Sequence, residues 1–274
     1  MDKQYAFPGF WRKTFAALGL YALTTIFSVQ SQDFTSGKWL DLTHEFNEQS
    51  IYWPTAEPFK KTTVFEGQTP GGFYYSAYNF AAAEHGGTHL DSPVHFYQGQ
   101  QSVEQIPLEQ LIGPAVVIDI SSKTAQNRDY QLTVADIQAW EAKQGKIPDG
   151  SILLVNTGFA RYYGDQKKYM GTVKRGEQGV KELSFPGIHP KAAEFIASKR
   201  KIKAVGLDTP SLDYGKSTQF QSHVTLFSHN IPGFENVANL NSLPATGATV
   251  VALPMKIKGG SGGPLRIVAF VPNR

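Results

Sequence analysis

The chain has 274 residues, of which 41% are hydrophobic and 18% charged, a composition typical of a folded globular protein and not of a disordered one. Its formal net charge of +3 is small, and no basic cluster interleaved with aromatic residues occurs, which argues against a nucleic-acid-binding protein. The sequence contains no cysteine, which excludes disulfides, thiolate zinc sites, iron–sulfur clusters and a cysteine nucleophile. Any bound metal must be held by imidazole and carboxylate groups.

The N-terminal segment differs in character from the rest of the chain. Arg12 and Lys13 precede an apolar run from Phe15 to Val29, which is shorter than the roughly twenty residues that a membrane span needs. This pattern predicts a secretory signal peptide over residues 1–31, cleaved after Ser31, and a secreted or periplasmic protein without stable membrane insertion after cleavage. An uncleaved anchor or a buried N-terminal helix is the alternative.

Beyond residue 31, short β-rich runs alternate with two helical patterns. Seven runs rich in Val, Ile, Leu and Tyr predict strands, at residues 39–43, 74–80, 115–120, 151–157, 204–207, 249–253 and 265–270. Helices are predicted at residues 132–145, where Thr133 and Asp136 can form a capping box, and at residues 189–200, which carry Pro190 in the first turn. No linker divides the chain, so we predict one α/β domain over residues 32–274, with a mixed β-sheet core and flanking helices.

A glycine-rich segment, KGGSGGP, occupies residues 258–264 near the C-terminus. The simpler interpretation is a flexible turn before the last strand. The alternative is a loop whose backbone N–H groups approach a ligand closely. The segment does not match a phosphate-binding fingerprint, because no helix signal follows it.

Three of the seven histidines, His85, His89 and His95, fall within eleven consecutive residues that also include Asp91. Full extension would separate the first and last of them by roughly 33 Å, so a shared site requires the segment to bend. The glycine pair at residues 86–87 and a proline allow that bend, and we expect no helix or regular strand here. Imidazole and carboxylate groups are suitable ligands for Zn²⁺ or Mn²⁺, so the segment predicts a metal site.

The segment HGGTHLDSPVHF, residues 85–96, resembles the His-x-Gly-Thr-His-x-Asp-x-Pro-x-His signature of the metal-dependent cyclase family. That family includes bacterial kynurenine formamidases and isatin hydrolases. The resemblance implies that His85, His89 and Asp91 bind one or two ions of Zn²⁺ or Mn²⁺. It further implies that His95 transfers protons, that the fold is swivelling β/β/α-like, and that the protein is a homo-oligomer.

Other segments extend the resemblance along the chain. His223 and Glu235 stand twelve residues apart, as a His and a Glu do in the formamidases, which implies that they complete the metal site and that Asp91 and Glu235 bridge two ions. The segment YWP at residues 52–54 resembles the segment that covers the substrate, which implies a substrate-binding role for Trp53; a plain core tryptophan is the rival interpretation.

Four further residues are expected to be structural. The segment VGLDTPSLD, residues 205–213, resembles one that delivers Asp208 toward the site, but capping or turn formation is at least as good an explanation. His44, His189 and His229 match no position of the motif.

The implied activity is that of a metal-dependent amidohydrolase acting on C–N bonds other than peptide bonds. A divalent ion lowers the pKa of bound water toward about 7, which makes hydroxide available to attack an amide carbonyl. His95 could then hand a proton to the leaving nitrogen, and Trp53, Tyr74 and Phe80 could stack on an aromatic leaving group.

The resemblance leaves three functions open. The first is cleavage of an aryl formamide, as in the kynurenine formamidases of tryptophan catabolism. The second is ring opening of a cyclic amide such as isatin, which the added length around residues 162–185 favours. The third is a non-catalytic protein that binds a metal or small molecule, against which the presence of His95 argues.

Overall fold

The computed structural model describes residues 34–273, and the chain from Phe34 onward forms one compact unit. The predicted signal peptide over residues 1–31 lies outside the described residues. None of the helices within residues 34–273 has the length and apolar character that crossing a bilayer requires.

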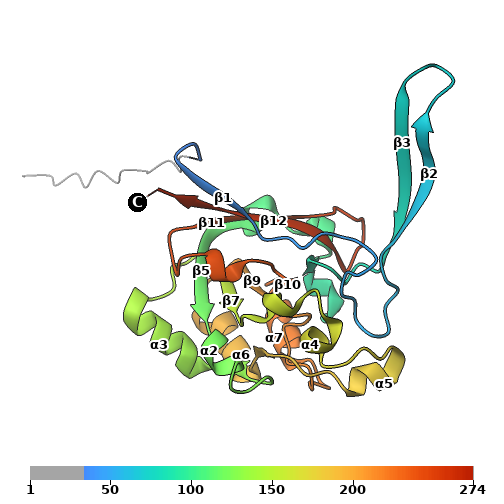
Figure 1. Ribbon diagram of the computed structural model, residues 1–274. Helices are drawn as coiled ribbons and strands as arrows, with labels where there is room; N and C mark the ends of the chain where they lie inside the picture. Colours follow the sequence, from blue (N-terminus) through green and yellow to red (C-terminus); the bar gives the residue numbers. More distant parts are fainter. Residues whose placement is uncertain (1–33, 274) are drawn as a thin grey trace, which may run out of the picture. The chain divides into compact units, whose positions relative to one another are not determined.

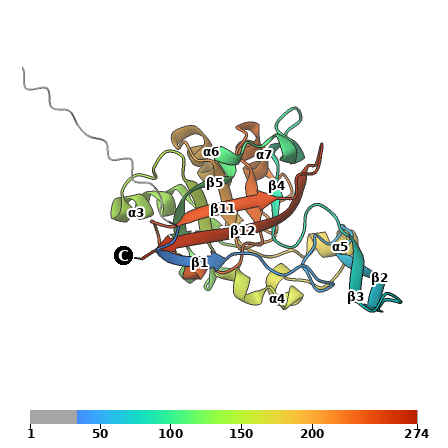
Figure 2. The same ribbon diagram turned by 90° about the horizontal axis from the view of Figure 1, so that it is seen from above.

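The core of the unit is a mixed sheet that closes on itself. Its strands run in the order β1-β12-β11-β5-β7-β9-β10-β4, and β4 also pairs with β12, which completes the ring (Figures 1 and 2). The strands are β1 (Gly37–Asp41), β4 (His89–Asp91), β5 (Ile112–Asp119), β7 (Ile152–Asn156), β9 (Ala204–Leu207), β10 (Gly233–Glu235), β11 (Thr249–Pro254) and β12 (Gly262–Pro272).

The parallel strands β5, β7 and β9 form the centre of the sheet and are buried on both faces. Their alternating side chains enter two different cores, because successive residues of a strand point to opposite faces. Ala115 and Val117 of β5 join a core made by the strands of the ring, whereas Val116 and Ile118 join a core shared with the helices. The strands β5, β7 and β9 therefore consist of nearly continuous apolar residues, as is usual for parallel sheets that are covered on both faces.

The helices α3, α6 and α7 lie side by side below the sheet in Figure 1 and behind it in Figure 2. The α-helices are α1 (Leu108–Leu111), α2 (Ser121–Thr124), α3 (Val134–Gln144), α4 (Gln166–Met170), α5 (Gly176–Lys181), α6 (Pro190–Lys199) and α7 (Gln221–Ser228). Short 3₁₀ turns occur at η1 (Pro93–His95), η2 (Val103–Gln105), η3 (Phe159–Tyr162) and η4 (Leu240–Ser242). The predicted cap of α3 is present: Thr133 and Asp136 form a capping box, and the helix ends at Gly145.

Two small sheets stand outside the ring. The strands β6 (Gln131–Leu132) and β8 (Gly187–Ile188) pair in parallel. The strands β2 (Lys60–Gln68) and β3 (Tyr74–Ala81) form an antiparallel hairpin that projects away from the ring (Figure 1). The hairpin leaves the ring just before β4, so its two ends lie close to the segment that carries the histidine cluster.

The predicted α/β fold with a mixed sheet core and flanking helices is confirmed. Each predicted strand and both predicted helices correspond to an observed element, with shifts of a few residues at the ends. The expectation that residues 83–99 hold no regular strand is wrong, because His89–Asp91 forms β4 and is paired on both sides, with β10 and β12. Three residues are too short a run for an alternating pattern to reveal.

Candidate metal centre and active site

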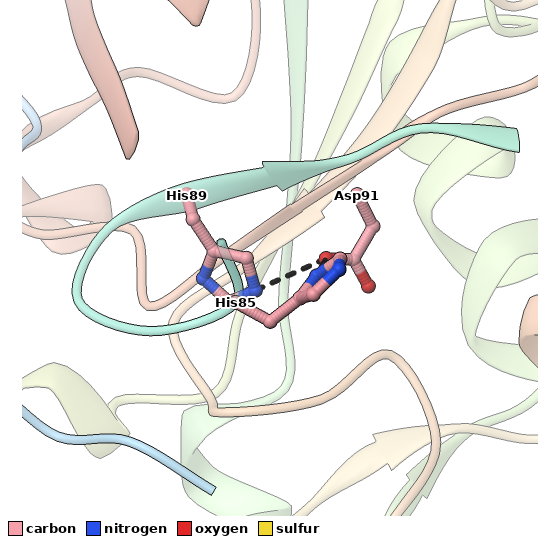
Figure 3. Close-up of side chains that lie close together, drawn as sticks. All are labelled: His85, His89 and Asp91. Carbon is pink, nitrogen blue, oxygen red and sulfur yellow. Dashed lines mark hydrogen bonds and ion pairs between the residues drawn. The ribbon is translucent and has the colours of Figure 1, made fainter. Parts of the chain in front are cut away.

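The three side chains drawn in Figure 3 come from β4 and the turn that leads into it. Gly87 adopts φ +59°, a backbone conformation that suits glycine, and a Cβ at this position would collide with the Phe46 ring. This turn folds His85 back over β4, where His89 and Asp91 point to the same side. The bend expected from the glycine pair is therefore observed.

The imidazoles converge on one carboxylate oxygen of Asp91. His85 Nδ1 lies 2.6 Å and His89 Nε2 lies 3.0 Å from Asp91 Oδ1 (Figure 3). Asp91 is 2% exposed, and the side chain of His85 is 22% exposed. The first three predicted ligands are thus brought together around a buried carboxylate.

Of the remaining predicted ligands, His223 approaches the other oxygen of Asp91, and Glu235 lies between His223 and His89. His223, on α7, places Nε2 3.3 Å from Asp91 Oδ2 and 3.0 Å from Glu235 Oε1. Glu235 lies on β10, directly opposite His89 of β4, and its Oε2 lies 3.4 Å from His89 Nε2. The five residues therefore form two adjacent groups that share Asp91.

These groups meet the spatial requirement for metal binding. The candidate ligand atoms of His85, His89 and Asp91 all lie within 4.8 Å of one another, and so do those of Asp91, His223 and Glu235. The Nε2 atom of His89 is buried without a hydrogen-bond partner, although two carboxylates lie close to it. A buried polar atom in this situation calls for a ligand, and a divalent cation fits the surrounding donors.

The outer nitrogen of each imidazole is held by an oxygen acceptor. His89 Nδ1 donates to the Gly87 carbonyl at 3.0 Å, and His223 Nδ1 donates to Asp213 at 2.6 Å. His85 Nε2 lies 2.8 Å from Ser261 Oγ, whose hydroxyl donates to Glu84 at 2.7 Å. Each histidine can therefore direct a lone pair at the cluster from its other nitrogen, which is how metal-ligating histidines are usually held.

The cluster has strongly perturbed proton affinities. Burial would lower the pKa of His89, but the neighbouring Asp91 and Glu235 carboxylates outweigh it and raise this pKa to about 9. Burial likewise works against protonation of His223, yet the carboxylates around it raise its pKa well above the usual value. Burial and the Asp91 charge raise the pKa of Glu235. The buried carboxylates of Asp91 and Glu235 therefore favour binding of a positive charge, either a proton or a cation, within the cluster.

His95 occupies a different position from the ligand candidates. It ends η1 and stacks on the His85 ring with centroids 3.7 Å apart, and it lines the same cavity. Burial lowers the pKa of His95 to about 4, so its imidazole is neutral near pH 7. Neither metal-type group includes this residue. A neutral imidazole beside the cluster is suited to accept a proton.

Comparison with known proteins places the chain in a family. The sequence profile of the Cyclase family matches residues 40–214. The chain belongs to the Cyclase family. It is 33% identical to the isatin hydrolase of Roseibium aggregatum over 77% of this chain and 80% of that protein. It is 24% identical to the kynurenine formamidase of Bacillus cytotoxicus over 85% of this chain and 97% of that protein.

A solved structure agrees with this membership. Isatin hydrolase A from Ralstonia solanacearum superposes with a TM-score of 0.77 at 32% identity, covering 85% of this chain and 92% of that one. The chain is thus a Cyclase-family metal-dependent hydrolase, similar both to isatin hydrolases and to kynurenine formamidases.

An aromatic cavity of about 290 Å³ opens onto the cluster. Its apolar walls come from Tyr52, Trp53, Phe96 and Phe220, and its floor includes the five ligand candidates and His95. Trp53 therefore lines the cavity, as the family resemblance implies, and it also packs against a small core that contains Phe185. Both interpretations of this tryptophan describe part of its surroundings.

The expected stacking role of Tyr74 and Phe80 is not supported by the structure. Both side chains lie on the β2–β3 hairpin, each 58% exposed, and neither lines the cavity. The prediction took aromatic residues near the motif in sequence to be near it in space. Phe96 and Phe220 occupy the walls instead, and nothing in their local sequence distinguished them from core residues.

The residues expected to be structural have structural surroundings. Asp208 is buried beside η3, where it accepts hydrogen bonds from the Thr157 hydroxyl and from two backbone N–H groups. His44 stacks on Tyr163 with centroids 3.6 Å apart, and burial lowers its pKa to about 4. His189 caps α6, and His229 contacts the last turn of α7.

The residues that hold the ligands in place were missed by the sequence analysis. Glu84 and Asp213 lie within or beside segments that carried a family resemblance, but no spacing rule assigned them a partner. Ser261 sits in the glycine-rich segment, and a Cβ at Gly262 would lie 2.6 Å from His85 Cε1. The glycine at position 262 therefore lets this segment approach the His85 side chain closely. The interpretation of KGGSGGP as a loop whose backbone N–H groups approach a ligand stays a prediction.

We predict that Ser261→Ala weakens metal binding, because His85 loses the acceptor that fixes its ring orientation. The dissociation constant for Zn²⁺, measured by competition with a chromogenic chelator, should rise about 10- to 100-fold. Ser228→Ala is the matched control, because its hydroxyl bonds only within and just beyond α7. Equal affinity in Ser261→Ala and the parent would show that this hydroxyl does not orient His85.

Proposed function

We propose that this protein hydrolyses the amide C–N bond of a small, uncharged aromatic lactam, as the name of its isatin hydrolase relative suggests. The observation that carries the proposal is the combination of a two-part His/Asp/Glu cluster with a compact aromatic cavity whose described lining contains no Lys or Arg. The 33% identity to isatin hydrolase supports the same choice.

The first part of the cluster, His85, His89 and Asp91, would hold one divalent ion. The second part, His223 and Glu235 together with the shared Asp91, would hold another. Imidazole and carboxylate donors suit Zn²⁺ or Mn²⁺. Such an ion, when bound, supplies a water of lowered pKa and polarises the amide carbonyl.

The proposal assigns proton transfer to His95. Its neutral imidazole lines the cavity beside the cluster and can accept a proton from the attacking water. In the overall reaction the water oxygen bonds to the carbonyl carbon and the ring C–N bond breaks. The nitrogen then receives a proton from His95 and becomes an aryl amine, the carbonyl carbon becomes a carboxylate on the same molecule, and the second proton of the water is released to solvent.

The cavity favours a neutral, flat substrate. Tyr52, Trp53, Phe96 and Phe220 offer ring faces and edges for stacking, and a volume of about 290 Å³ suits a bicyclic compound. Among the described residues that line the cavity, none is Lys or Arg. A substrate with a free carboxylate, such as N-formylkynurenine, would find no Lys or Arg there to pair with it.

The second candidate is cleavage of an aryl formamide, which the similarity to kynurenine formamidases supports. The sequence alone placed this function first, and the absence of Lys and Arg from the described cavity lining is what moves it to second place. A binding protein without catalysis is the third candidate. His95 argues against it, because a binding site has no need of a neutral base beside its ligands.

The proposal predicts a ranking of substrates by kcat/KM. Isatin should exceed formanilide, a neutral aryl formamide, and both should exceed N-formylkynurenine, because only the last carries charges that the cavity does not match. The measurement is steady-state hydrolysis on protein whose Zn and Mn content has been determined. Faster turnover of N-formylkynurenine than of isatin would contradict the proposed substrate class, and metal-loaded protein inactive on all three would favour the binding protein.

A second prediction separates His95 from the ligands. His95→Ala should retain metal, because its ring is outside both groups, yet its kcat should fall roughly 100- to 10,000-fold, the usual worth of general acid–base catalysis. Asp91→Ala should lose metal and activity together, because both groups share that carboxylate. Metal analysis and kinetics on both variants provide the test. Loss of metal from His95→Ala would make His95 a ligand, and near-parental turnover would assign proton transfer to another group.

We also propose that the protein is exported and acts outside the cytoplasm. The support is the sequence pattern of residues 1–31, in which Arg12 and Lys13 precede a short apolar run. Expression of the full chain in a bacterial host should yield a mature N-terminus near Gln32 in the periplasm or medium. Sequencing of the N-terminus checks this, and a soluble cytoplasmic product that retains Met1 would refute it.

A further inference from the structure

The segment of added length, residues 162–185, is not part of the aromatic cavity. Among the described residues that line this cavity, none lies between positions 97 and 209. The segment folds into α4 and α5, which are joined by a short loop. Any effect of the segment on the cavity must therefore pass through residues that the segment contacts.

The start of α5 binds the backbone of one cavity wall. The Arg175 guanidinium donates one hydrogen bond to the Trp53 carbonyl, at 3.3 Å, and another to the Ala56 carbonyl. The backbone N–H of Gly176 donates to the Pro54 carbonyl at 2.9 Å. Two consecutive residues thus hold three carbonyls of the turn that carries Trp53.

We call residues 53–56 the wall turn. Both Trp53 and Ala56 line the cavity, and the Ala56 N–H donates to the Trp53 carbonyl at 2.9 Å. Among the described residues, this is the only backbone hydrogen bond between two members of the turn. A turn with one internal bond is weakly held by itself, so its position depends on the contacts that Arg175 and Gly176 add.

We call residues 172–182, which include α5, the clamp. The clamp also packs directly against the wall turn. A Cβ at Gly179 would lie 2.9 Å from the Pro54 Cβ, so glycine is what lets α5 approach this closely. Val180 packs against the same small core as Trp53. Hydrogen bonds and apolar contacts from the clamp therefore act on the same short stretch of backbone.

One carboxylate braces the clamp internally. Glu182 accepts hydrogen bonds from three clamp side chains, namely Thr172 at 2.9 Å, Lys174 at 2.5 Å and Gln178 at 2.8 Å. These donors come from the beginning and the middle of the clamp, whereas Glu182 ends it. The exposed clamp is consequently tied together as a unit that can hold Arg175 in place.

We propose that Arg175 is a positioning residue that fixes the aromatic wall of the cavity and thereby favours flat aromatic ligands. A guanidinium presents its N–H donors as a rigid planar fork, so one side chain can hold two carbonyls at a set separation. A wall that is already fixed does not have to be ordered by the ligand, which lowers the entropic cost of binding. The inference rests on the proposed function for the class of ligand, a neutral flat aromatic compound.

Arg175 is poorly placed to pair with a charged substrate. Its side chain does not line the cavity, and two of its nitrogens already donate to the carbonyls of Trp53 and Ala56. Among the described residues, no carboxylate forms an ion pair with it. The contribution of Arg175 to binding is therefore to the shape of the cavity and not to its charge.

Ligand affinity provides the first test, with indole as a neutral bicyclic probe that cannot be hydrolysed. In Arg175→Ala the indole dissociation constant, measured by calorimetry, and the KM for isatin should both rise about 3- to 10-fold. The kcat should stay within about twofold and the metal content should not change, because Arg175 touches neither the cluster nor His95. Arg175→Lys, which keeps a donor but not the fork, should recover part of the affinity.

Lys181→Ala is the matched control, since Lys181 is an exposed basic residue of the same helix that does not contact the wall turn. It should bind indole as the parent does. Equal affinity of Arg175→Ala and the parent for indole would overturn the proposal, as would a parent that does not bind indole. A parent that binds indole but leaves isatin intact would refute the proposed substrate and leave the role of Arg175 supported.

Hydrogen–deuterium exchange tests whether Arg175 acts through the wall turn. Peptides that cover residues 53–56 should exchange faster in Arg175→Ala than in the parent, while peptides from β7 should be unchanged. Saturating indole should slow the exchange of the variant, because the ligand then orders the wall that Arg175 no longer holds. Weaker indole binding with unchanged exchange at residues 53–56 would show that Arg175 acts by another route and would overturn the proposal.

Discussion

The site depends on the burial of one carboxylate, that of Asp91. Its two oxygens face different imidazoles, with His85 and His89 on one side and His223 on the other. Removing a charged group from water is costly unless opposite charges or hydrogen bonds stabilise it. Among the described residues, no lysine or arginine contacts the Asp91 carboxylate. The imidazoles therefore hold the pKa of Asp91 well below its usual range despite the opposing effect of burial. The contacts with the three imidazoles thus offset the cost of burying the Asp91 carboxylate.

The backbone around Asp91 is arranged to leave room for that geometry. Asp91 is paired with Gly233 of β10 on one side and with Gly262 of β12 on the other. A side chain at Gly262 would lie against the His85 ring, and one at Gly233 would lie 2.8 Å from a methyl group of Leu212. Glycine on β12 thus allows the His85 imidazole to approach the carboxylate, whereas glycine on β10 leaves space for the Leu212 side chain.

Much of this arrangement follows from the sequence, and the exceptions have physical reasons. The strands of the parallel centre are continuous apolar runs, and α3 has side chains that cap its start, so both are evident from local pattern. The strands β4 and β10 have three residues each, too few for periodicity. Helix α7, which carries His223, begins after Phe220 at φ +47° and has no side-chain cap, so no start signal precedes it. The ligand residues were nevertheless identified, because their chemistry and spacing are unusual even where their secondary structure is not apparent.

The strand β12 connects the closure of the ring with the geometry of the cluster. It pairs with β4 at its first residues and with β11 and β1 farther along, so the ring of strands closes only through residues near the C-terminus. Ser261, which orients His85, immediately precedes it. The ligands on β4 therefore take up their final positions only once β12, a distant segment of the chain, has paired with β4. Closing the ring of strands and assembling the cluster are consequently one event and not two.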